Sequence, residues 1–268
     1  MSKKILITGS TDGIGKLAAI RLALEGHVVI LHGRNREKLD ACMQEVKEQT
    51  GSDTISGYLA DFSDLEAVRS MADQVKSDHS ELDVLINNAG IYNSPTTVNK
   101  DGLDIRFVVN YLAPVVLTRE LFSLLARAQD PRIINLGSAA QAPVNLSSLQ
   151  NGGSLSDQSA YAQSNLALTM WSFFQAKVLN GVSTIVVNPG SLLDTKMVKE
   201  AFGQVWASAD KGAEILKDLA LSDEYRGITG RYYDNDRGGF GQAHPDANDT
   251  AKLEELINVT ESLLYAQS

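Results

Sequence analysis

The segment SAYAQSNLAL, residues 159–168, places a tyrosine and an asparagine one helical turn apart. In a helix the side chains of Tyr161 and Asn165 project from the same face. A tyrosine hydroxyl can exchange a proton with a substrate, but an unperturbed tyrosine has a pKa of about 10, poorly matched to proton transfer at neutral pH. Asparagine forms hydrogen bonds but carries no charge to stabilise a phenolate. The pair is therefore a candidate acid–base site without a neighbouring cation.

A second candidate site is the glycine-rich stretch TGSTDGIG, which follows the first apolar segment and opens a helical pattern. Gly9, Gly13 and Gly15 have the spacing G-x-x-x-G-x-G, with Ile14 between the last two. Glycines allow a tight turn and the close approach of a ligand to the backbone. The following helix start offers free N–H groups and the positive end of a dipole, which suit a pyrophosphate. The stretch predicts a dinucleotide-binding turn, with a glycine turn that binds nothing as the alternative.

The end of the second apolar segment indicates which dinucleotide is bound. A carboxylate at this place binds the ribose 2′-hydroxyl of NAD, whereas an arginine accommodates the 2′-phosphate of NADP. The chain reads LHGRN, with Arg34 and no carboxylate. A guanidinium can pair with a phosphate through charge-assisted hydrogen bonds. NADP(H) is therefore the predicted cofactor, and a solvated surface arginine is the alternative.

These residues lie in a chain that alternates short β-branched runs with longer helical patterns. Strands are predicted within residues 3–10, 27–33, 54–61, 82–90, 132–138, 183–190 and 230–236. Helices are predicted over about 13–25, 35–49, 65–77 and 103–128, and a further one holds Tyr161; residues 143–157 and 236–249 are predicted loops. Such alternation implies parallel strands with right-handed crossovers. We expect one α/β domain over residues 1–268, a doubly wound, Rossmann-like parallel sheet with helices on both faces.

Composition narrows the classes of partner. The apolar share of 43% is typical of a globular protein, and the net charge of −9 without a basic block argues against nucleic acid. One cysteine, Cys42, and four scattered histidines argue against a metal site. The first strand begins directly after the N-terminus, and no apolar run of about 18 residues is evident. We therefore expect a cytoplasmic protein with no membrane partner.

Taken in order, the motifs resemble those of the short-chain dehydrogenase/reductase family over nearly the whole chain, with a lean toward its retinol-dehydrogenase-like branch. Beyond the glycine turn, the matching positions are Asp61, the NNAG stretch with Asn88 and Gly90, Asn110, Ser138, Tyr161, and the NPGSLLDT stretch with Pro189, Gly190 and Thr195. Taken singly, each has a plainer explanation, such as a helix cap for Asn110, a strand-end turn for Ser138 or a core position for Tyr161. The ordered set favours the family.

The resemblance implies a role for each position. Asp61 is expected at the adenine, Asn88 and Gly90 beside the cofactor, and Pro189, Gly190 and Thr195 over the nicotinamide. Asn110, Ser138, Tyr161 and position 165 form the expected catalytic set, in which the tyrosine exchanges a proton and the serine binds the substrate oxygen. The implied activity is NADP(H)-dependent interconversion of a carbonyl and an alcohol by hydride transfer.

The chain departs from this pattern at Asn165, because the family has a lysine there. That lysine holds the nicotinamide ribose and lowers the pKa of the tyrosine by its charge. Three interpretations stay open: a lysine removed by engineering, a slow or unusual natural enzyme, or a non-catalytic NADP(H)-binding or sensing protein. The survival of Asn110, Ser138 and Tyr161 favours a substitution that is recent or engineered. The leading expectation is an enzyme whose activity is impaired by Asn165.

Two further expectations concern the surroundings of the site. Hydrophobic residues of 192–206 are expected to form a lid over a mostly apolar small-molecule substrate, with residues 143–157 as additional pocket wall. Trp171, Phe173 and Phe174 cannot all face one side of their helix. We therefore expect apolar surface on this helix to pack against a second subunit, giving a homodimer or homotetramer.

Overall fold

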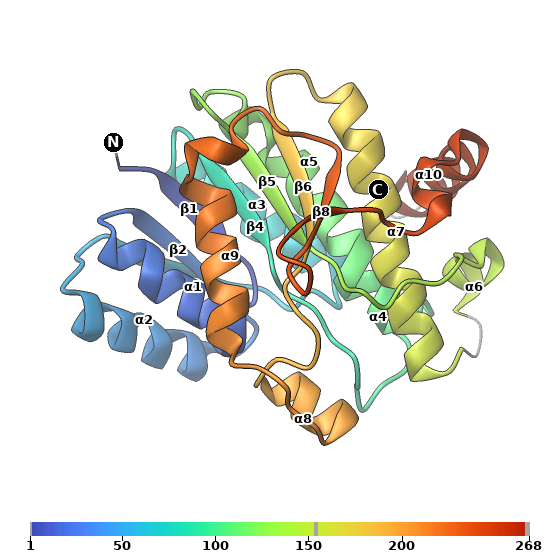
Figure 1. Cartoon of the computed structure of the whole chain (residues 1–268), viewed down its shortest axis with the longest axis horizontal. Coiled ribbons are helices and arrows are strands. Elements are labelled where there is room, and N and C mark those ends of the chain that lie inside the picture. Colours follow the sequence, from blue (N-terminus) through green and yellow to red (C-terminus); the bar gives the residue numbers. More distant parts are fainter. Residues whose placement is uncertain (1, 153–154, 266–268) are drawn as a thin grey trace.

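A single eight-stranded sheet runs through the protein, whose computed structural model describes residues 2–152 and 155–265 (Figure 1). The strand order is β3-β2-β1-β4-β5-β6-β7-β8. The strands are β1 Lys4–Ile7, β2 Val28–Gly33, β3 Ile55–Leu59, β4 Val84–Asn87, β5 Arg132–Leu136, β6 Ser183–Asn188, β7 Arg231–Asp234 and β8 Gly239–Gly241. Neighbours from β3 to β7 are parallel. The predicted doubly wound α/β sheet is confirmed.

The edge strand β8 is the exception to the parallel pattern. It pairs antiparallel with β7, because a short turn joins the two strands directly instead of a helical crossover. The prediction of a loop over residues 236–249 is therefore wrong for β8, and also for the 3-10 turn Pro245–Asn248.

Helices cover both faces of the sheet. One face carries α1 Gly13–Leu24, α2 Arg36–Thr50 and α9 Ala209–Leu221. The other carries α3 Leu65–Asp78, α5 Ala113–Leu125, α7 Asp157–Val178 and α10 Thr250–Tyr265. Along β1, Ile5 and Ile7 enter the first of these cores and Leu6 the second, and all three are fully buried. This two-sided burial explains why the strands read as continuous apolar runs.

The helix expected over residues 103–128 is not regular. It consists of α4 Ile105–Phe107, a π-helical turn Val108–Leu112, and α5. The backbone N–H of Ala113 donates to the carbonyl of Val108, five residues back. Residues 105–125 are long and apolar enough to cross a membrane, but 78% of the apolar window is buried within the fold. The segment therefore packs as a core helix in this structure.

The predicted loop over residues 143–157 is also wrong in part. A short helix, α6 Leu146–Asn151, begins at the cap Asn145 and ends at Gly152, which has a φ of 62°. Residues 153–154 of that prediction lie outside the described residues. Three other helices were not predicted from the sequence: α8 Lys196–Phe202, α9 and α10.

The aromatic residues of α7 pack within the chain itself. Trp171 is fully buried, and Phe173 and Phe174 pack partly buried against the same core. The C-terminal helix α10 and the turn Pro245–Asn248 both contact α7. Trp171 therefore adds no apolar surface outside the fold, whereas Phe173 and Phe174 keep part of theirs, and the oligomeric state stays a prediction.

Candidate active site

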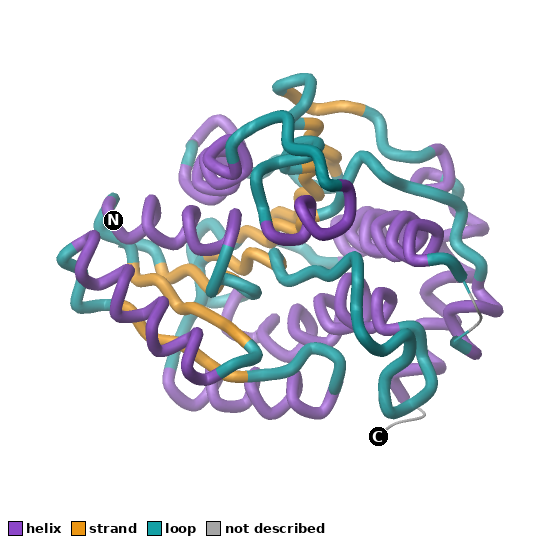
Figure 2. The backbone as a smooth tube through the Cα atoms, turned by 90° about the horizontal axis from the view of Figure 1, so that it is seen from below, coloured by secondary structure: helices purple, strands orange, loops and turns teal. Residues whose placement is uncertain are grey.

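The proposed catalytic side chains meet beyond the carboxyl end of β5. Ser138 lies just after this strand, and Tyr161 and Asn165 lie on α7, which packs against β5 and β6. The side chains of Ser138 and Asn165 both form hydrogen bonds with the Tyr161 side chain. In the view from below, loops cross this side of the sheet (Figure 2). The fold thus gathers three groups that lie up to 27 positions apart in the sequence.

Burial raises the pKa of Tyr161 above its ordinary value. The hydrogen bonds from Ser138 and Asn165 act in the opposite direction, because they stabilise the phenolate, but they do not offset burial. The ring of Tyr92 lies beside that of Tyr161, with centroids 5.0 Å apart, and adds a smaller upward contribution. Among the described residues, no positive charge contributes to the pKa of this tyrosine. The site therefore holds a protonated tyrosine at neutral pH.

Asn165 turns partly back onto its own helix. Its side chain is 4% exposed, and its amide donates to the backbone carbonyl of Tyr161 at 3.0 Å. One amide thus serves both the hydroxyl and the backbone of the same tyrosine. Asparagine consequently positions Tyr161 without supplying the charge that a lysine would bring.

Asn110 braces the site and is not bonded to the tyrosine hydroxyl. Its amide oxygen accepts the N–H of Ile91 at 2.8 Å, and its amide nitrogen donates to the Ile91 carbonyl at 3.0 Å. The same nitrogen lies 3.1 Å from Oγ of Ser164, on α7. The π-helical turn therefore links the segment after β4 to the helix that carries Tyr161.

Ser138 is itself held by its neighbours. Its Oγ accepts the N–H of Ala140 at 3.1 Å. Its carbonyl accepts from the Gln141 side chain at 3.0 Å and from the Tyr232 hydroxyl at 3.1 Å. Tyr232 comes from β7, so the second half of the sheet contributes to the position of this serine.

The glycine turn lies between β1 and α1, as predicted. Gly9 has a φ of 62°, and an added Cβ would approach the backbone of Ala89 to 2.8 Å. An added Cβ at Gly15 would lie 2.4 Å from the side-chain nitrogen of Asn88. That nitrogen donates to the carbonyls of Thr8 and Gly9 at 2.8 and 3.0 Å. The glycines thus make room for close packing under the turn, and Asn88 braces it.

The helix start at this turn fits a phosphate. The side chain of Asp12 caps the N–H of Gly13 at 2.7 Å. For the amides of Ile14 and Gly15, no acceptor lies within hydrogen-bond distance in residues 2–152 and 155–265. Free N–H groups at a helix N-terminus are the donors that bind a pyrophosphate.

The stretch after β6 closes over the glycine turn. An added Cβ at Gly13 would lie 3.6 Å from the Thr195 methyl group, so the two segments face each other. Thr195 caps α8 by accepting the N–H of Val198 at 3.3 Å. The carbonyl of Pro189 accepts from Asn235 at 2.8 Å, and the N–H of Gly190 donates to Asn188 at 3.2 Å. The predicted residues from both ends of the chain therefore meet at one edge of the sheet.

Arg34 and Asp61 lie at the same edge, after β2 and β3. Both are exposed, and Gly33 pairs with Leu59 in the sheet register, which brings the two segments side by side. Asp61 accepts the N–H of Ser63 at 2.9 Å. None of the ion pairs in the described part of the chain includes Arg34. Its guanidinium is therefore available to a phosphate.

Three residues at the site were missed by sequence reasoning. Tyr92 contacts Tyr161, Tyr232 holds Ser138, and Asp236 accepts from both the N–H and the hydroxyl of Ser191, at 2.9 and 2.5 Å. Of the three, only Tyr92 could have been found from the sequence, since it lies two residues after the NNAG stretch. The other two depend on the pairing of β6 with β7.

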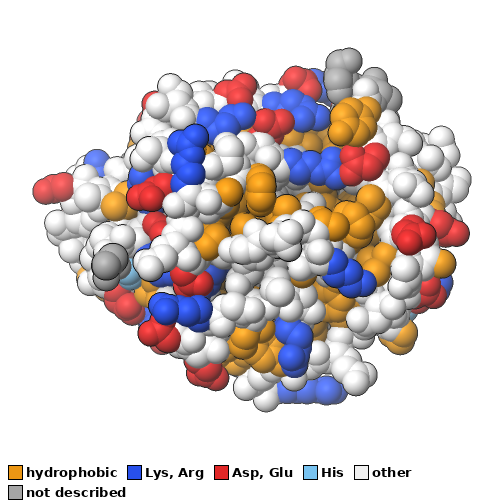
Figure 3. Space-filling model, turned by 90° about the horizontal axis from the view of Figure 1, so that it is seen from above, with side chains coloured by type: hydrophobic (Ala, Val, Ile, Leu, Met, Phe, Trp, Pro, Cys, Tyr) orange, Lys and Arg blue, Asp and Glu red, His pale blue; other side chains and the backbone are white. Residues whose placement is uncertain are grey.

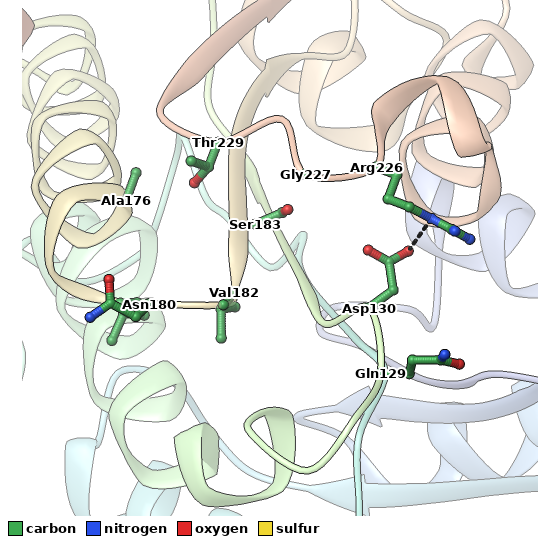
Figure 4. A pocket seen from close by; sticks show the side chains of 11 residues that line it. Gln129, Asp130, Ala176, Asn180, Val182, Ser183, Arg226, Gly227 and Thr229 are labelled. Carbon is green, nitrogen blue, oxygen red and sulfur yellow. Dashed lines mark ion pairs between the residues drawn. The ribbon is translucent and has the colours of Figure 1, made fainter.

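The opposite edge of the sheet, at the amino ends of its strands, contains a pocket. A pocket of about 500 Å³ lies at the amino ends of β5, β6 and β7, where Asp130 and Arg226 form an ion pair at 3.8 Å (Figure 4). Seen from above, hydrophobic side chains gather in the middle of the molecule, among acidic and basic side chains that lie beside one another (Figure 3). The pocket includes no residue of the predicted site. No group of metal-ligating side chains occurs among the described residues.

Comparisons with known proteins agree with this geometry. The family model described as short chain dehydrogenase matches residues 3–206. Human polyprenol dehydrogenase is 31% identical over 87% of this chain and 76% of its own length, and human retinol dehydrogenase 13 is 28% identical over 87% and 76%. A short chain dehydrogenase from Burkholderia cenocepacia J2315, solved in complex with NADP, has a TM-score of 0.69 and 28% identity over 87% of this chain and 95% of its own.

The match covers most of the chain and includes the glycine turn, Ser138, Tyr161 and Thr195 in one continuous alignment range. The two human relatives are a polyprenol dehydrogenase and a retinol dehydrogenase by their names. The chain therefore belongs to the short chain dehydrogenase family of oxidoreductases, in its retinol-dehydrogenase-like branch.

Proposed function

We propose that the protein is an NADP(H)-dependent oxidoreductase that interconverts a carbonyl and an alcohol on a mostly apolar small molecule. The observation that carries the proposal is the Tyr161 hydroxyl, which is hydrogen-bonded to the side chains of Ser138 and Asn165. The cofactor, when bound, supplies or accepts the hydride. The names of the human relatives, polyprenol dehydrogenase and retinol dehydrogenase 13, support an apolar substrate.

The residues present fit NADP(H). The free amides of Ile14 and Gly15 would bind the pyrophosphate, and the exposed Arg34 would pair with the 2′-phosphate. Asp61 follows β3 beside Arg34 and would accept from the adenine. The NADP complex of the Burkholderia relative supports the same cofactor.

In the proposed reduction, Tyr161 donates its proton to the substrate oxygen while Ser138 donates a hydrogen bond to the same oxygen. In oxidation Tyr161 removes the proton from the alcohol. The raised pKa of Tyr161 favours the protonated form, which is the form that reduction requires. Oxidation at neutral pH is slow for the same reason, because the phenolate is rare. We therefore propose that the protein works better as a reductase than as a dehydrogenase.

The test is consumption of NADPH with a panel of apolar aldehydes and ketones that includes retinal and a polyprenal. Activity should be lost in Tyr161→Phe and reduced in Ser138→Ala. Tyr265→Phe is the matched control, because Tyr265 is 72% exposed at the end of α10 and is not part of the proposed site. Activity that survives Tyr161→Phe would contradict the proposal.

A second candidate function is NADP(H) binding without catalysis. Asn165 supports it, because this residue lacks the positive charge that the family's lysine has at the same position. On this alternative the chain binds NADP(H) without turnover. NADPH binding with no reduction of any panel member, in both the native protein and Asn165→Lys, would favour it. Turnover by the protein with Asn165 would exclude it.

A further inference from the structure

A buried histidine lies beneath the proposed cofactor site and contacts two of its segments. His32, on β2, is 3% exposed. Its Nδ1 lies 3.0 Å from the N–H nitrogen of Gly9, and its Nε2 lies 3.0 Å from the carbonyl oxygen of Ala60. A carbonyl can only accept, so Nε2 carries the proton. Nδ1 is then free to accept from Gly9, and both ring nitrogens are satisfied.

The backbone of His32 strengthens the same link. Its carbonyl accepts the N–H of Ser10 at 3.0 Å, and its own N–H donates to Oγ of Ser10 at 2.9 Å. The ring also stacks on Phe62, with centroids 4.2 Å apart and an interplanar angle of 24°. His32 therefore joins the glycine turn to the segment that holds Asp61.

The ring must be neutral to do this. A second proton on Nδ1 would place an N–H against the N–H of Gly9 and break that hydrogen bond. Burial lowers the pKa of His32 to about 4, although the nearby Asp61 carboxylate acts to raise it. Cys42, from α2, bonds to the Ser10 carbonyl and is un-ionised at neutral pH, because burial raises its pKa to about 11.

We propose that His32 is a positioning residue for the cofactor, which holds the pyrophosphate turn and the adenine-side segment at one fixed spacing. The inference rests on the proposed binding of NADP(H). His32 does not touch the cofactor; it acts through Gly9 on one side and Ala60 on the other. Protonation of the ring releases the turn, so cofactor binding weakens in acid beyond what the cofactor's own phosphate explains.

Three variants separate positioning from simple packing. His32→Phe keeps a ring against Phe62 but removes both hydrogen bonds. His32→Asn places an amide oxygen near Nδ1 and keeps an acceptor for Gly9. His27→Phe is the matched control: His27 also accepts a backbone N–H through Nδ1, from Lys3 at 3.0 Å, but it lies at the other end of β2.

The measurement is the dissociation constant of NADP⁺ by calorimetry, together with the melting temperature. His32→Phe should weaken binding roughly tenfold, the effect of about one lost hydrogen bond. His32→Asn should stay within about threefold of the native protein, and His27→Phe should bind unchanged even if it melts lower. Native affinity in a folded His32→Phe, or equal weakening in all three variants, would overturn the proposal.

A second readout does not need cofactor. In ¹⁵N-labelled protein at neutral pH, Nδ1 of His32 should be unprotonated and Nε2 protonated, and exchange of the Gly9 amide should be slow. Lowering the pH through about 4 should protonate the ring and lower the protection of the Gly9 amide relative to its intrinsic exchange rate at the same pH, but not in His32→Asn. A ring protonated at Nδ1 at neutral pH would overturn the inference. If the native protein shows the expected tautomer but binds no NADP⁺, the cofactor assignment fails and the link between Gly9 and Ala60 stands.

Discussion

Position 165 determines how Tyr161 behaves in the proposed reaction, because the fold partly buries this tyrosine and gives it only neutral hydrogen-bond partners. A partly buried hydroxyl with neutral partners keeps its proton. A lysine at position 165 would add a charge beside the phenolate and lower the pKa of Tyr161. Each pKa unit corresponds to about 1.4 kcal/mol between the two protonation states.

We therefore expect Asn165→Lys to raise turnover. In the pH–rate profile of alcohol oxidation, the rise in rate toward alkaline pH should move to lower pH. In the native protein, oxidation should still be rising at the highest pH at which it is folded. The measurement is the pH–rate profile of both proteins with one alcohol substrate. Asn165→Gln, which lengthens the side chain without adding charge, is the control. Equal rates and one common profile for native protein and lysine variant would show that position 165 has no charge role.

A second prediction that concerns a single residue is made for Arg34. Arg34→Asp should weaken NADP(H) and improve NAD(H) relative to it, since an acid repels the 2′-phosphate and accepts from a 2′-hydroxyl. A charge-assisted pair is worth about 1.5–3 kcal/mol, so the affinity ratio should change at least roughly tenfold. Arg36→Asp is the matched control, because Arg36 is also exposed but begins α2. An unchanged ratio in Arg34→Asp would show that this arginine does not bind the phosphate.

At the scale of elements, the segment after β6 is pinned at its base. The N–H of Trp206 donates to the Leu192 carbonyl at 2.9 Å, and the N–H of Asp194 donates to the Ala207 carbonyl at 2.8 Å. Between these bonds the chain runs out through α8 and returns. A lid that moves here would therefore be shorter than the predicted 192–206, because the two ends of the segment are bonded to each other.

This arrangement makes Trp206 a reporter of lid closure. Trp206 is 72% exposed, whereas Trp171, the other tryptophan of the chain, is fully buried. If the lid orders over cofactor and substrate, the emission of Trp206 should shift to shorter wavelength on binding. Trp206→Phe should remove that shift and leave the emission of Trp171 unchanged. A shift that persists in Trp206→Phe would argue against movement of this segment.

Another element-scale feature is the buried guanidinium of Arg106, which connects α4 to the start of α7. Arg106 is 1% exposed and pairs with Asp104 at 2.8 Å and Asp157 at 2.5 Å. Arg106→Met leaves the buried Asp104 carboxylate without its cation, which should lower the free energy of unfolding by about 3–5 kcal/mol. Asp157 is half exposed, so Asp157→Asn should cost about 1 kcal/mol or less. Urea unfolding measures the free energy of unfolding of both variants. An equally small decrease in the two variants would contradict this explanation.

The elements that could be predicted are those whose burial leaves a hydrophobic pattern in the sequence. Strands such as Val28–Gly33 read as apolar runs because both of their faces are buried. The strand Gly239–Gly241 has three residues and two glycines, and α6 has six residues in a Ser- and Asn-rich stretch. Neither element is long enough to show a periodic pattern of hydrophobic residues in the sequence. Their conformation depends on neighbours that only the folded chain brings together.

The same distinction applies to the site. The glycine turn, Ser138 and Tyr161 could be found because their types and order follow a family pattern. The contacts of Tyr232 and Asp236 could not, since they reach Ser138 and Ser191 across the sheet from residues more than 40 positions away. The side chain of Asn110 is bonded to Ile91 and Ser164, which the sequence could not show, and its catalytic role stays a prediction.

For the whole molecule, buried histidines predict sensitivity to acid. An unfolded histidine has a pKa of 6.5, whereas His32 in the fold has a pKa of about 4. Protons therefore bind the unfolded chain first, and stability present above pH 6.5 is lost as the pH falls toward 4. The difference between the two values corresponds to about 3 kcal/mol. His27 and His79, whose pKa values are also lowered by burial, act in the same direction.

We expect the free energy of unfolding to decrease between pH 6.5 and 4, and to decrease less in His32→Asn. Urea unfolding at pH 7.5 and pH 4.5 measures the change for each protein. Carboxylates such as Asp130, whose pKa is lowered by its arginine and lysine partners, contribute equally to both proteins and cancel in the comparison. The same pH dependence in both would mean that His32 does not carry this sensitivity.

The π-helical turn at Val108–Leu112 has a consequence for how this chain tolerates change in length. A turn that closes from residue i to i+5 contains one residue more than an α-helical turn, so it is equivalent to a single-residue insertion. Deleting Val109 would leave an α-helical turn that still closes one full rotation, so the two sides of the helix would keep their relative orientation. Arg106 and Thr118 could then still face their present partners together. The loss of one codon should therefore be tolerated better in this turn than in the regular helix α5, where it would rotate one side by about 100°.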